Sequence, residues 1–266
     1  MDFRQKLSNA WAVSGSRLCV GLDPLLDRIP ARFRCESRPI LAFNKWIIDQ
    51  VGDLVCALKP QHAHHAALAC EADLAETIAY IHARHPAVLV ILDAKRGDIG
   101  ATADLYAKEA FDRYDADAVT VNPFMGDDSV LPFLTRPDRG AVVLCRTSNP
   151  DAARIQGLAT KGNKPLFAEI AQRAQEVWNA QGNVMLVVGA TAPEDMRLVR
   201  AAAPQVPFLV PGIGEQGGSI TDVLSAGLSA DGQGLVVSAS RSILFAGDAG
   251  QVRSAAVAAR SQLLAT

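Results

Sequence analysis

The sequence predicts a single (β/α)8 (TIM) barrel that occupies the whole chain, residues 1–266. Short apolar runs recur at regular intervals, segments with helical patterning lie between most of them, and polar residues follow nearly every run. An open, doubly wound sheet would share the first two features. The third favours the barrel, because the strand ends of a barrel converge on one face, whereas an open sheet gathers its functional residues in one crevice.

Eight apolar runs are the predicted strands. Each run is continuous rather than alternating, which indicates a strand covered on both faces, as in a parallel sheet flanked by helices. The runs are Leu18–Leu22, Leu54–Leu58, Val88–Leu92, Ala118–Val121, Ala141–Leu144, Val184–Val188, Phe208–Val210 and Leu235–Val237.

Segments with helical patterning separate most of these strands. Several begin with Pro or Ser near the first turn, as helix starts do. The segments are Pro39–Val51, Ala66–Arg84, Ala101–Phe111, Pro165–Ala180, Pro193–Ala202, Ser219–Ala226 and Ala249–Leu264. No low-complexity tract or linker interrupts the alternation, and the longest loop-like connection is Ser148–Lys164. We therefore expect one domain, which a chain that is 49% hydrophobic can supply with a large core.

The charge balance excludes several classes of partner. The chain has 26 Lys plus Arg against 28 Asp plus Glu, so no global field draws it to nucleic acid or to an acidic membrane surface. No apolar run approaches the roughly 18 residues that cross a bilayer. The cysteines are odd in number and lack Cys-x-x-Cys spacing, which indicates free thiols in a reducing compartment. We expect a soluble, cytoplasmic protein that holds any anion in a local site.

Polar residues follow the predicted strands, at the ends that a barrel brings together. They are Asp23, Lys59, Asp93 with Lys95, Asn122, Ser148, Thr191, Gln216, and Ser240 with Arg241. Because Asp93 and Lys95 are two residues apart at a strand end, we expect them to point to the same face, with Asp98 in the loop beyond. Charges away from water are tolerated when they alternate in sign. For a generic Asp-x-Lys, a surface ion pair is the simpler interpretation.

The longer run around these residues favours a functional interpretation. Leu92–Gly100, which reads Leu-Asp-Ala-Lys-Arg-Gly-Asp-Ile-Gly, resembles the signature of the orotidine monophosphate decarboxylase family, particularly its bacterial type 2 branch. Further motifs of the same family occur in the expected order between residues 18 and 245. They are Val20–Pro24, Leu58–Gln61, Val121–Gly126, Thr147–Pro150, Val188–Thr191 and Val210–Gly218.

The resemblance implies a lyase that converts orotidine 5'-monophosphate to uridine 5'-monophosphate and carbon dioxide in pyrimidine synthesis, with no cofactor and no metal. Lys95 matches the lysine that protonates carbon 6 of the pyrimidine, and Asp93, Lys59 and Asp98 match the rest of its charged network. A fixed ammonium beside the developing lone pair would stabilise the carbanion. The same ammonium could then act as general acid.

The resemblance also implies substrate contacts and an assembly. Asp23 and Lys59 match ribose-contacting positions, and Ser148 matches the serine that reads the pyrimidine edge. Gln216 and Arg241 match the residues that bind the phosphate, assisted by the backbone around Ser240. Ile99 and Pro211 are the remaining substrate-binding positions. In the family, the residues that match Asp98 and Thr102 reach into the neighbouring subunit's site. The resemblance therefore implies a homodimer.

Two alternatives remain open. Related sugar-phosphate decarboxylases and aldolases share Asp-x-Lys-x-x-Asp but need magnesium, and they resemble one another in a glutamate ligand after the second strand. Lys59-Pro60 stands at that position here, which argues against the metal. A catalytically inactive barrel that binds a phosphate ligand is the other alternative, and the intact set of Lys59, Asp93, Lys95 and Asp98 argues against it.

Two further motifs are interpreted as structural. His62-x-His64-His65 has the composition of a metal cluster, but we expect these histidines to begin the second helix or to lie on the dimer surface. Gly212-x-Gly214-x-x-Gly217 fits a dinucleotide-binding pattern. It follows the seventh strand, however, whereas that fingerprint normally follows the first strand of its fold.

Overall fold

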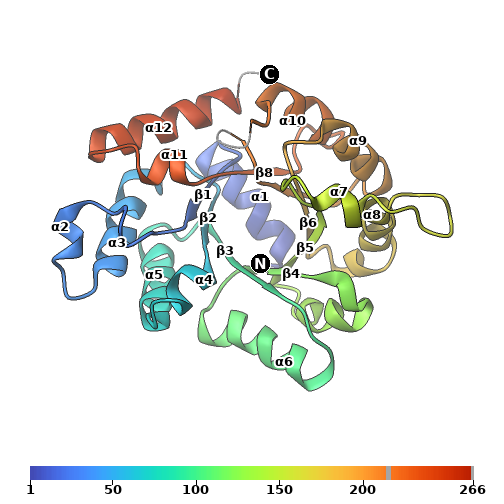
Figure 1. The fold of residues 1–266 in the computed structure, drawn as a ribbon, viewed down its shortest axis with the longest axis horizontal. Helices are drawn as coiled ribbons and strands as arrows, with labels where there is room; N and C mark the ends of the chain where they lie inside the picture. Colours follow the sequence, from blue (N-terminus) through green and yellow to red (C-terminus); the bar gives the residue numbers. More distant parts are fainter. Residues whose placement is uncertain (214–216, 265–266) are drawn as a thin grey trace.

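Eight parallel strands close into a barrel in sequence order in the computed structural model, which describes residues 1–213 and 217–264 (Figure 1). The strands are β1 (Leu18–Leu22), β2 (Ala57–Pro60), β3 (Leu89–Arg96), β4 (Ala118–Val121), β5 (Gly140–Arg146), β6 (Val184–Val188), β7 (Phe208–Val210) and β8 (Leu235–Ala239). The pairing of β8 with β1 closes the ring. The predicted barrel is confirmed, and the open sheet is wrong.

Helices surround the barrel (Figure 1). The α-helices are α1 (Phe3–Ser14), α2 (Ala31–Arg34), α3 (Pro39–Val51), α4 (His62–Ala66), α5 (Glu71–Arg84), α6 (Gly100–Lys108), α7 (Ala152–Gln156), α8 (Leu166–Glu176), α9 (Pro193–Ala202), α10 (Ile220–Gly227), α11 (Arg241–Leu244) and α12 (Ala249–Gln262). Within the described residues the structure also has a π-helical turn, η1 (Glu109–Arg113), and the 3₁₀ turns η2 (Pro123–Met125), η3 (Asp127–Ser129), η4 (Leu131–Leu134) and η5 (Trp178–Gln181). None of the helices in the described ranges is long and apolar enough to cross a membrane.

The strands separate two apolar layers. The larger layer lies between the strands and the surrounding helices, and includes Phe43 and Phe208. The smaller layer fills the interior of the barrel with side chains such as Cys19, Ala57 and Met185. Because both faces of each strand are covered, the strand sequences are apolar at successive positions rather than alternately.

Helix α1 belongs to the inner layer and closes the amino-terminal end of the barrel (Figure 1). Asp2 caps it, since its side chain accepts from the Gln5 amide while the Gln5 side chain accepts from the Asp2 amide. Phe3, Leu7 and Trp11 are buried against the lumen, and Trp11 Nε1 donates to the carbonyl of Leu235 at 3.0 Å. This helix was missing from the predicted elements, although its sequence is amphipathic.

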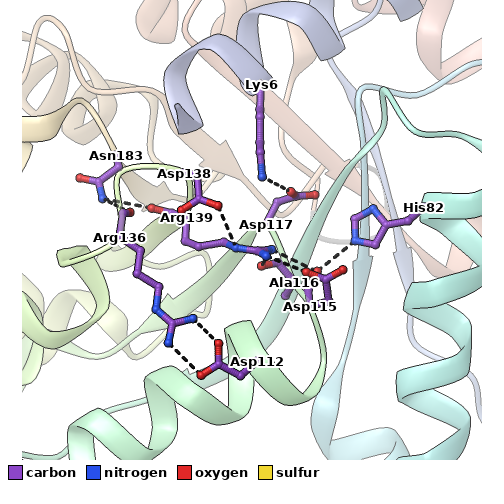
Figure 2. Close-up of polar contacts among 10 residues, drawn as sticks. All are labelled: Lys6, His82, Asp112, Asp115, Ala116, Asp117, Arg136, Asp138, Arg139 and Asn183. Carbon is purple, nitrogen blue, oxygen red and sulfur yellow. Dashed lines mark hydrogen bonds and ion pairs between the residues drawn. The ribbon is translucent and has the colours of Figure 1, made fainter. Parts of the chain in front are cut away.

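Polar contacts fasten the same end of the barrel (Figure 2). Lys6 of α1 forms an ion pair with Asp117, immediately before β4, at 3.0 Å. The guanidinium of Arg139, before β5, donates to the carbonyl of Ala116 at 2.8 Å and to Asp115. Asn183, before β6, donates to the carbonyl of Arg139. These bonds join successive strand entrances, so they are structural and leave the opposite end of the barrel open for a site.

The predicted boundaries differ from the observed ones where local structure is irregular. Four predicted strands, Leu18–Leu22, Ala118–Val121, Val184–Val188 and Phe208–Val210, match the observed strands. The predicted helix Ala66–Arg84 instead begins at Glu71, because α4 ends at Ala66 and Ala69 has a positive φ of 51° between the two helices.

Candidate active site

A cavity of about 490 Å³ opens at the carboxyl ends of the strands. Its polar wall includes Asp23, Lys59, Asp93, Lys95 and Ser148, which come from β1, β2, β3 and β5 or the residues that follow them. Leu144, Val187 and Leu209 give the cavity an apolar side. Its size and its few convergent polar groups are typical of a site for a small molecule.

Alternating charges form the centre of the polar wall. Lys59 Nζ lies 3.0 Å from Asp93 Oδ2, and Lys95 Nζ lies 2.6 Å from Asp93 Oδ1. Lys59 and Asp93 are 6% and 7% exposed, whereas the side chain of Lys95 is 49% exposed. One carboxylate is therefore held between a buried ammonium and an accessible one. The expectation that Asp93 and Lys95 meet at the strand end agrees with this geometry.

Burial and charge act in opposite directions on this network. Burial alone would raise the pKa of Asp93, but the ammonium groups of Lys59 and Lys95 outweigh it and hold that pKa well below its ordinary value. Burial likewise opposes the charge on Lys59, yet Asp93 and Asp23 hold the pKa of Lys59 above its ordinary value. Asp93 and Lys59 are consequently both charged at neutral pH.

Asp23 extends the network from the end of β1. Its Oδ1 lies 3.9 Å from Lys59 Nζ, is buried, and accepts no hydrogen bond among the described residues. A buried carboxylate oxygen without a donor is costly. Because Asp23 lines the cavity, a hydroxyl of a bound ligand could supply that donor.

Gly21 gives Asp23 and Ser240 room to face the same cavity. A Cβ at position 21 would lie 1.9 Å from Ser240 Oγ and 3.1 Å from Asp23 Oδ2. Both distances are shorter than ordinary contacts, so only glycine fits here without moving Ser240. The predicted positions Asp23 and Ser240 therefore depend on a residue that carries no functional group.

Asp98, Ile99 and Thr102 do not join the other predicted site residues within one chain. In the described part of the structure, none of the three lines the cavity. Asp98 accepts a hydrogen bond from the amide of Ile99 at 2.8 Å, and Ile99 and Thr102 are exposed. The assignment of these residues to a neighbouring subunit's site stays a prediction.

The remaining predicted contacts lie around the mouth of the cavity. Ser148, Pro211, Ser240 and Arg241 all line it, and Arg241 is the first residue of α11. Gln216 falls outside the described residues, so its predicted phosphate contact stays a prediction. The backbone of Ser148 is held by the loop that follows β6, because Thr191 Oγ1 donates to its carbonyl at 3.1 Å.

The three histidines after β2 have separate partners. His62 Nε2 lies 3.6 Å from Glu109 Oε1, which also pairs with Arg96, the residue after Lys95. Burial opposes the charge on Glu109, but His62 and Arg96 hold its pKa below the ordinary value. His64 Nδ1 lies 2.8 Å from the carbonyl of Pro24, and His65 packs inside the core. As predicted, the histidines lie at the start of the second helical segment, in α4.

Sequence reasoning missed several polar residues of the cavity wall, among them Thr120 and Gln156. Thr120 lies inside β4, where its apolar neighbours made the whole run resemble an ordinary buried strand. Gln156, from α7, accepts from the amide of Thr147 at 2.9 Å and so supports the loop before Ser148. A polar residue within a continuous apolar strand was the available signal for Thr120. Gln156 had none, because it lies in the connection expected to be a loop.

Comparisons with known proteins agree with this geometry. Residues 16–256 match the family described as "Orotidine 5'-phosphate decarboxylase / HUMPS family". The chain is 50% identical to the orotidine 5'-phosphate decarboxylase of Cellvibrio japonicus, over 99% of this chain and 98% of that one. It is 40% identical to the solved OMP decarboxylase of Leishmania donovani, with a TM-score of 0.87 and coverage of 100% and 98%.

A second solved structure, described as a putative orotidine-monophosphate-decarboxylase from Toxoplasma gondii, has a TM-score of 0.91 at 35% identity and covers 99% of this chain and 95% of that chain. Similarity thus extends over the barrel, the cavity and both ends of the chain, rather than over one motif. The chain belongs to the orotidine 5'-phosphate decarboxylase / HUMPS family.

Proposed function

We propose that this protein decarboxylates orotidine 5'-monophosphate to uridine 5'-monophosphate and carbon dioxide, as the last step of de novo pyrimidine nucleotide synthesis. The observation that carries the proposal is the row Lys59, Asp93 and Lys95 at the wall of a nucleotide-sized cavity, with the accessible ammonium of Lys95 2.6 Å from Asp93. Family membership and 50% identity to a curated decarboxylase over nearly the whole chain support it.

The chemistry follows from the position of Lys95. The bond between carbon 6 and the carboxylate breaks, carbon dioxide leaves, and the electron pair stays on carbon 6. The ammonium of Lys95 stabilises that charge as it develops. It then gives a proton to carbon 6 and regains one from water. The contact with Asp93 holds the Lys95 ammonium in place before the substrate arrives, so little reorganisation is needed during the reaction.

Substrate contacts at the cavity mouth would place carbon 6 against Lys95. In this proposal Asp23 and Lys59 bind the ribose hydroxyls and Ser148 binds the pyrimidine edge. Gln216, Arg241 and the backbone at Ser240 bind the phosphate. Interactions with the distant phosphate would help to order the site, because binding energy from non-reacting parts of a substrate can be used in this way.

The charge pattern disfavours the magnesium-dependent alternative. Both oxygens of Asp93 already contact ammonium groups, from Lys59 at 3.0 Å and from Lys95 at 2.6 Å. A divalent cation at this carboxylate would have to displace one of them and would meet the other at close range. In this proposal no metal acts at Asp93, and no step of the chemistry is assigned to an organic cofactor.

The experiment is to incubate the purified protein with orotidine 5'-monophosphate and excess chelator while following the pyrimidine absorbance. Turnover that persists in chelator is the expected result, whereas no turnover with or without added magnesium would overturn the proposal. Activity that disappears on chelation and returns with magnesium would favour the metal-dependent alternative.

The proposal includes a homodimer in which Asp98 and Thr102 enter the partner's site. Two observations support it. Asp98 does not line the cavity of its own chain in the described part of the structure. Large apolar side chains are also exposed around α6 and on the turns after β4, and α6 packs against two of these turns, η3 and η4. They are Ile99, which caps α6, Leu105, Phe124, Met125 and Leu131. A gathered apolar surface of this kind is typical of a protein interface.

A mixed dimer tests this arrangement. If Asp98 acts across the interface, a dimer of one Lys95→Ala subunit and one Asp98→Ala subunit has one intact site and one site with both changes. Random assortment would restore about one quarter of wild-type activity. Verified mixed dimers without activity would contradict the shared site, because Asp98 acting within its own chain leaves every site damaged.

The proposed location is the cytoplasm. All five cysteines are free, and three of them, Cys19, Cys56 and Cys145, are buried. Free thiols are usual in a reducing compartment. Cell fractionation with an antibody against the protein would test the location, and recovery outside the cytosolic fraction would contradict it.

A further inference from the structure

Strand β3 loses its regular pairing at the proposed reaction centre. Leu92 pairs with Val119 and Arg96 pairs with Val121, so three residues of β3 face only Thr120 of β4. These three residues are Asp93, Ala94 and Lys95. The irregularity is a bulge, a feature that is common beside active sites because it redirects side chains.

Lys95 adopts an unusual backbone conformation within this bulge. Its φ is +48°, in the left-handed region that residues with a Cβ rarely occupy. Such conformations persist when the surrounding structure holds them, and they are frequent at functional sites. Regular strand alternation therefore does not explain why the side chains of Asp93 and Lys95 meet. A specific contact must stabilise the bulge.

The hydroxyl of Thr120 makes three contacts with this segment. Its Oγ1 accepts hydrogen bonds from the amide of Ala94 at 2.9 Å and from the amide of Lys95 at 2.8 Å. The same hydroxyl donates to Asp93 Oδ1 at 2.9 Å. That carboxylate oxygen is also the one that contacts Lys95 Nζ. One side-chain oxygen thus replaces the strand pairing lost in the bulge and also orients the carboxylate that holds the lysine.

The hydrogen-bonding capacity of Thr120 is filled by these contacts. A hydroxyl has one donor and two acceptor positions, and all three are used within the protein. Thr120 is 1% exposed, although it borders the cavity. It has no remaining donor or acceptor for a substrate, which separates it from the contact residues Asp23 and Ser148.

We propose that Thr120 is a positioning residue that holds the Asp93–Lys95 bulge and aims the Lys95 ammonium at the reacting carbon. The inference rests on the proposed decarboxylase function. Thr120 would act on the chemical step through the placement of Lys95, and would contribute little to binding of the nucleotide. Its β-branched shape suits the strand, but the hydroxyl supplies the proposed effect.

Two substitutions separate the hydroxyl from the shape. Thr120→Val keeps the branched shape and removes all three hydrogen bonds, whereas Thr120→Ser keeps the hydroxyl and removes a methyl group. For Thr120→Val we expect kcat to fall by about 100-fold with KM within about threefold, since small displacements of a reacting group have large effects on rate. We expect Thr120→Ser to retain kcat within about threefold of wild type, because its hydroxyl can make the same bonds.

Thr77→Val is a matched control. Thr77 is also fully buried, and its Oγ1 accepts from Asn44 Nδ2 at 3.3 Å, but it lies in α5 outside the cavity wall. It reports the general effect of removing a buried threonine hydroxyl, and its kcat should stay near that of wild type. If Thr120→Val does not fold, Thr120→Cys takes its place, because a thiol is a weak donor and acceptor.

The kinetic outcomes decide the proposal. It is overturned if Thr120→Val keeps wild-type kcat, if Thr120→Ser loses as much as Thr120→Val, or if KM rises while kcat is unchanged. Failure of the wild-type protein to decarboxylate the substrate would count against the proposed function instead, and a crystal structure of Thr120→Val then decides the role of Thr120. We expect that structure to show Lys95 outside the left-handed region or Lys95 Nζ away from Asp93. An unchanged segment would overturn the positioning role.

Discussion

The row of charges formed by Lys59, Asp93 and Lys95 predicts that replacing different members lowers the free energy of unfolding by different amounts. Replacing Asp93 with Asn leaves Lys59, which is 6% exposed, with Asp23 at 3.9 Å as its nearest described carboxylate. It also leaves two ammonium groups near each other without the charge between them. Breaking a buried pair in this way costs about 3–5 kcal/mol. We therefore expect Asp93→Asn to lower the free energy of unfolding by at least about 3 kcal/mol.

Replacing Lys59 with Met should cost less than replacing Asp93. Asp93 then keeps Lys95 Nζ at 2.6 Å and the Thr120 hydroxyl at 2.9 Å, so its charge remains compensated. In the double variant neither buried charge remains, and exchanging a buried pair for neutral residues is often close to neutral. The double variant should thus be more stable than the sum of the single effects predicts, by about 0.5–3 kcal/mol.

Urea unfolding followed by tryptophan fluorescence measures these differences, with comparison restricted to variants whose m-values agree. Lys95→Met is the matched control, since the side chain of Lys95 is 49% exposed and an exposed pair contributes at most about 1 kcal/mol. Strictly additive effects of Lys59→Met and Asp93→Asn, or a loss below about 1 kcal/mol for Asp93→Asn, would refute the electrostatic interpretation.

Three further predictions follow from the same structure. Lys95→Ala should reduce turnover far more than it weakens binding of the nucleotide product, because in the proposed mechanism the ammonium acts mainly in the transition state. Kinetics measure the turnover, and calorimetric titration with uridine 5'-monophosphate measures the binding. Equal losses of turnover and of binding free energy would contradict the proposed role. The difference in unfolding free energy between wild type and Asp93→Asn should have its full size above about pH 5 and shrink as the pH falls below about 4. The reason is that the Asp93 carboxyl takes up a proton at higher pH in the unfolded chain than in the folded one, where its pKa is lowered. Urea unfolding across this pH range measures the difference, and a difference that grows on acidification would contradict the prediction. Phe3→Ala should lower the free energy of unfolding by about 3–5 kcal/mol, because Phe3 is 1% exposed and fills the amino-terminal end of the barrel. Thermal and urea unfolding measure this change. A decrease under about 1 kcal/mol would show that α1 contributes little to the core.

Much of the fold could be predicted because a buried parallel strand has a simple sequence pattern. The runs Leu18–Leu22 and Val184–Val188 are apolar at every position and match β1 and β6. Helix α1 was missed because it packs on the barrel end rather than between two strands, so it lies outside the alternating pattern. The π-turn Glu109–Arg113 was read as the end of a regular helix, since a π-turn has no clear sequence signal.

The candidate site was predictable where residues lie at strand ends. Asp23, Lys59, Asp93, Lys95 and Ser148 all line one cavity, as expected from their positions after successive strands. The bulge at Lys95 was not predictable, because the expected two-residue alternation already brought Asp93 and Lys95 together on one face. The role of Thr120 depends on that bulge, and so it required the structure.

Proton transfer between Lys95 Nζ and carbon 6 can be measured most directly in reverse. If Lys95 donates the proton to carbon 6 as proposed, the neutral amine must also be able to remove it. The protein should then exchange hydrogen 6 of uridine 5'-monophosphate with solvent deuterium. Proton NMR in D₂O at high enzyme concentration follows the loss of that signal. We expect loss with the wild-type protein and none above background with Lys95→Ala. Loss at the same rate with both proteins would contradict the assignment of Lys95 as the proton donor.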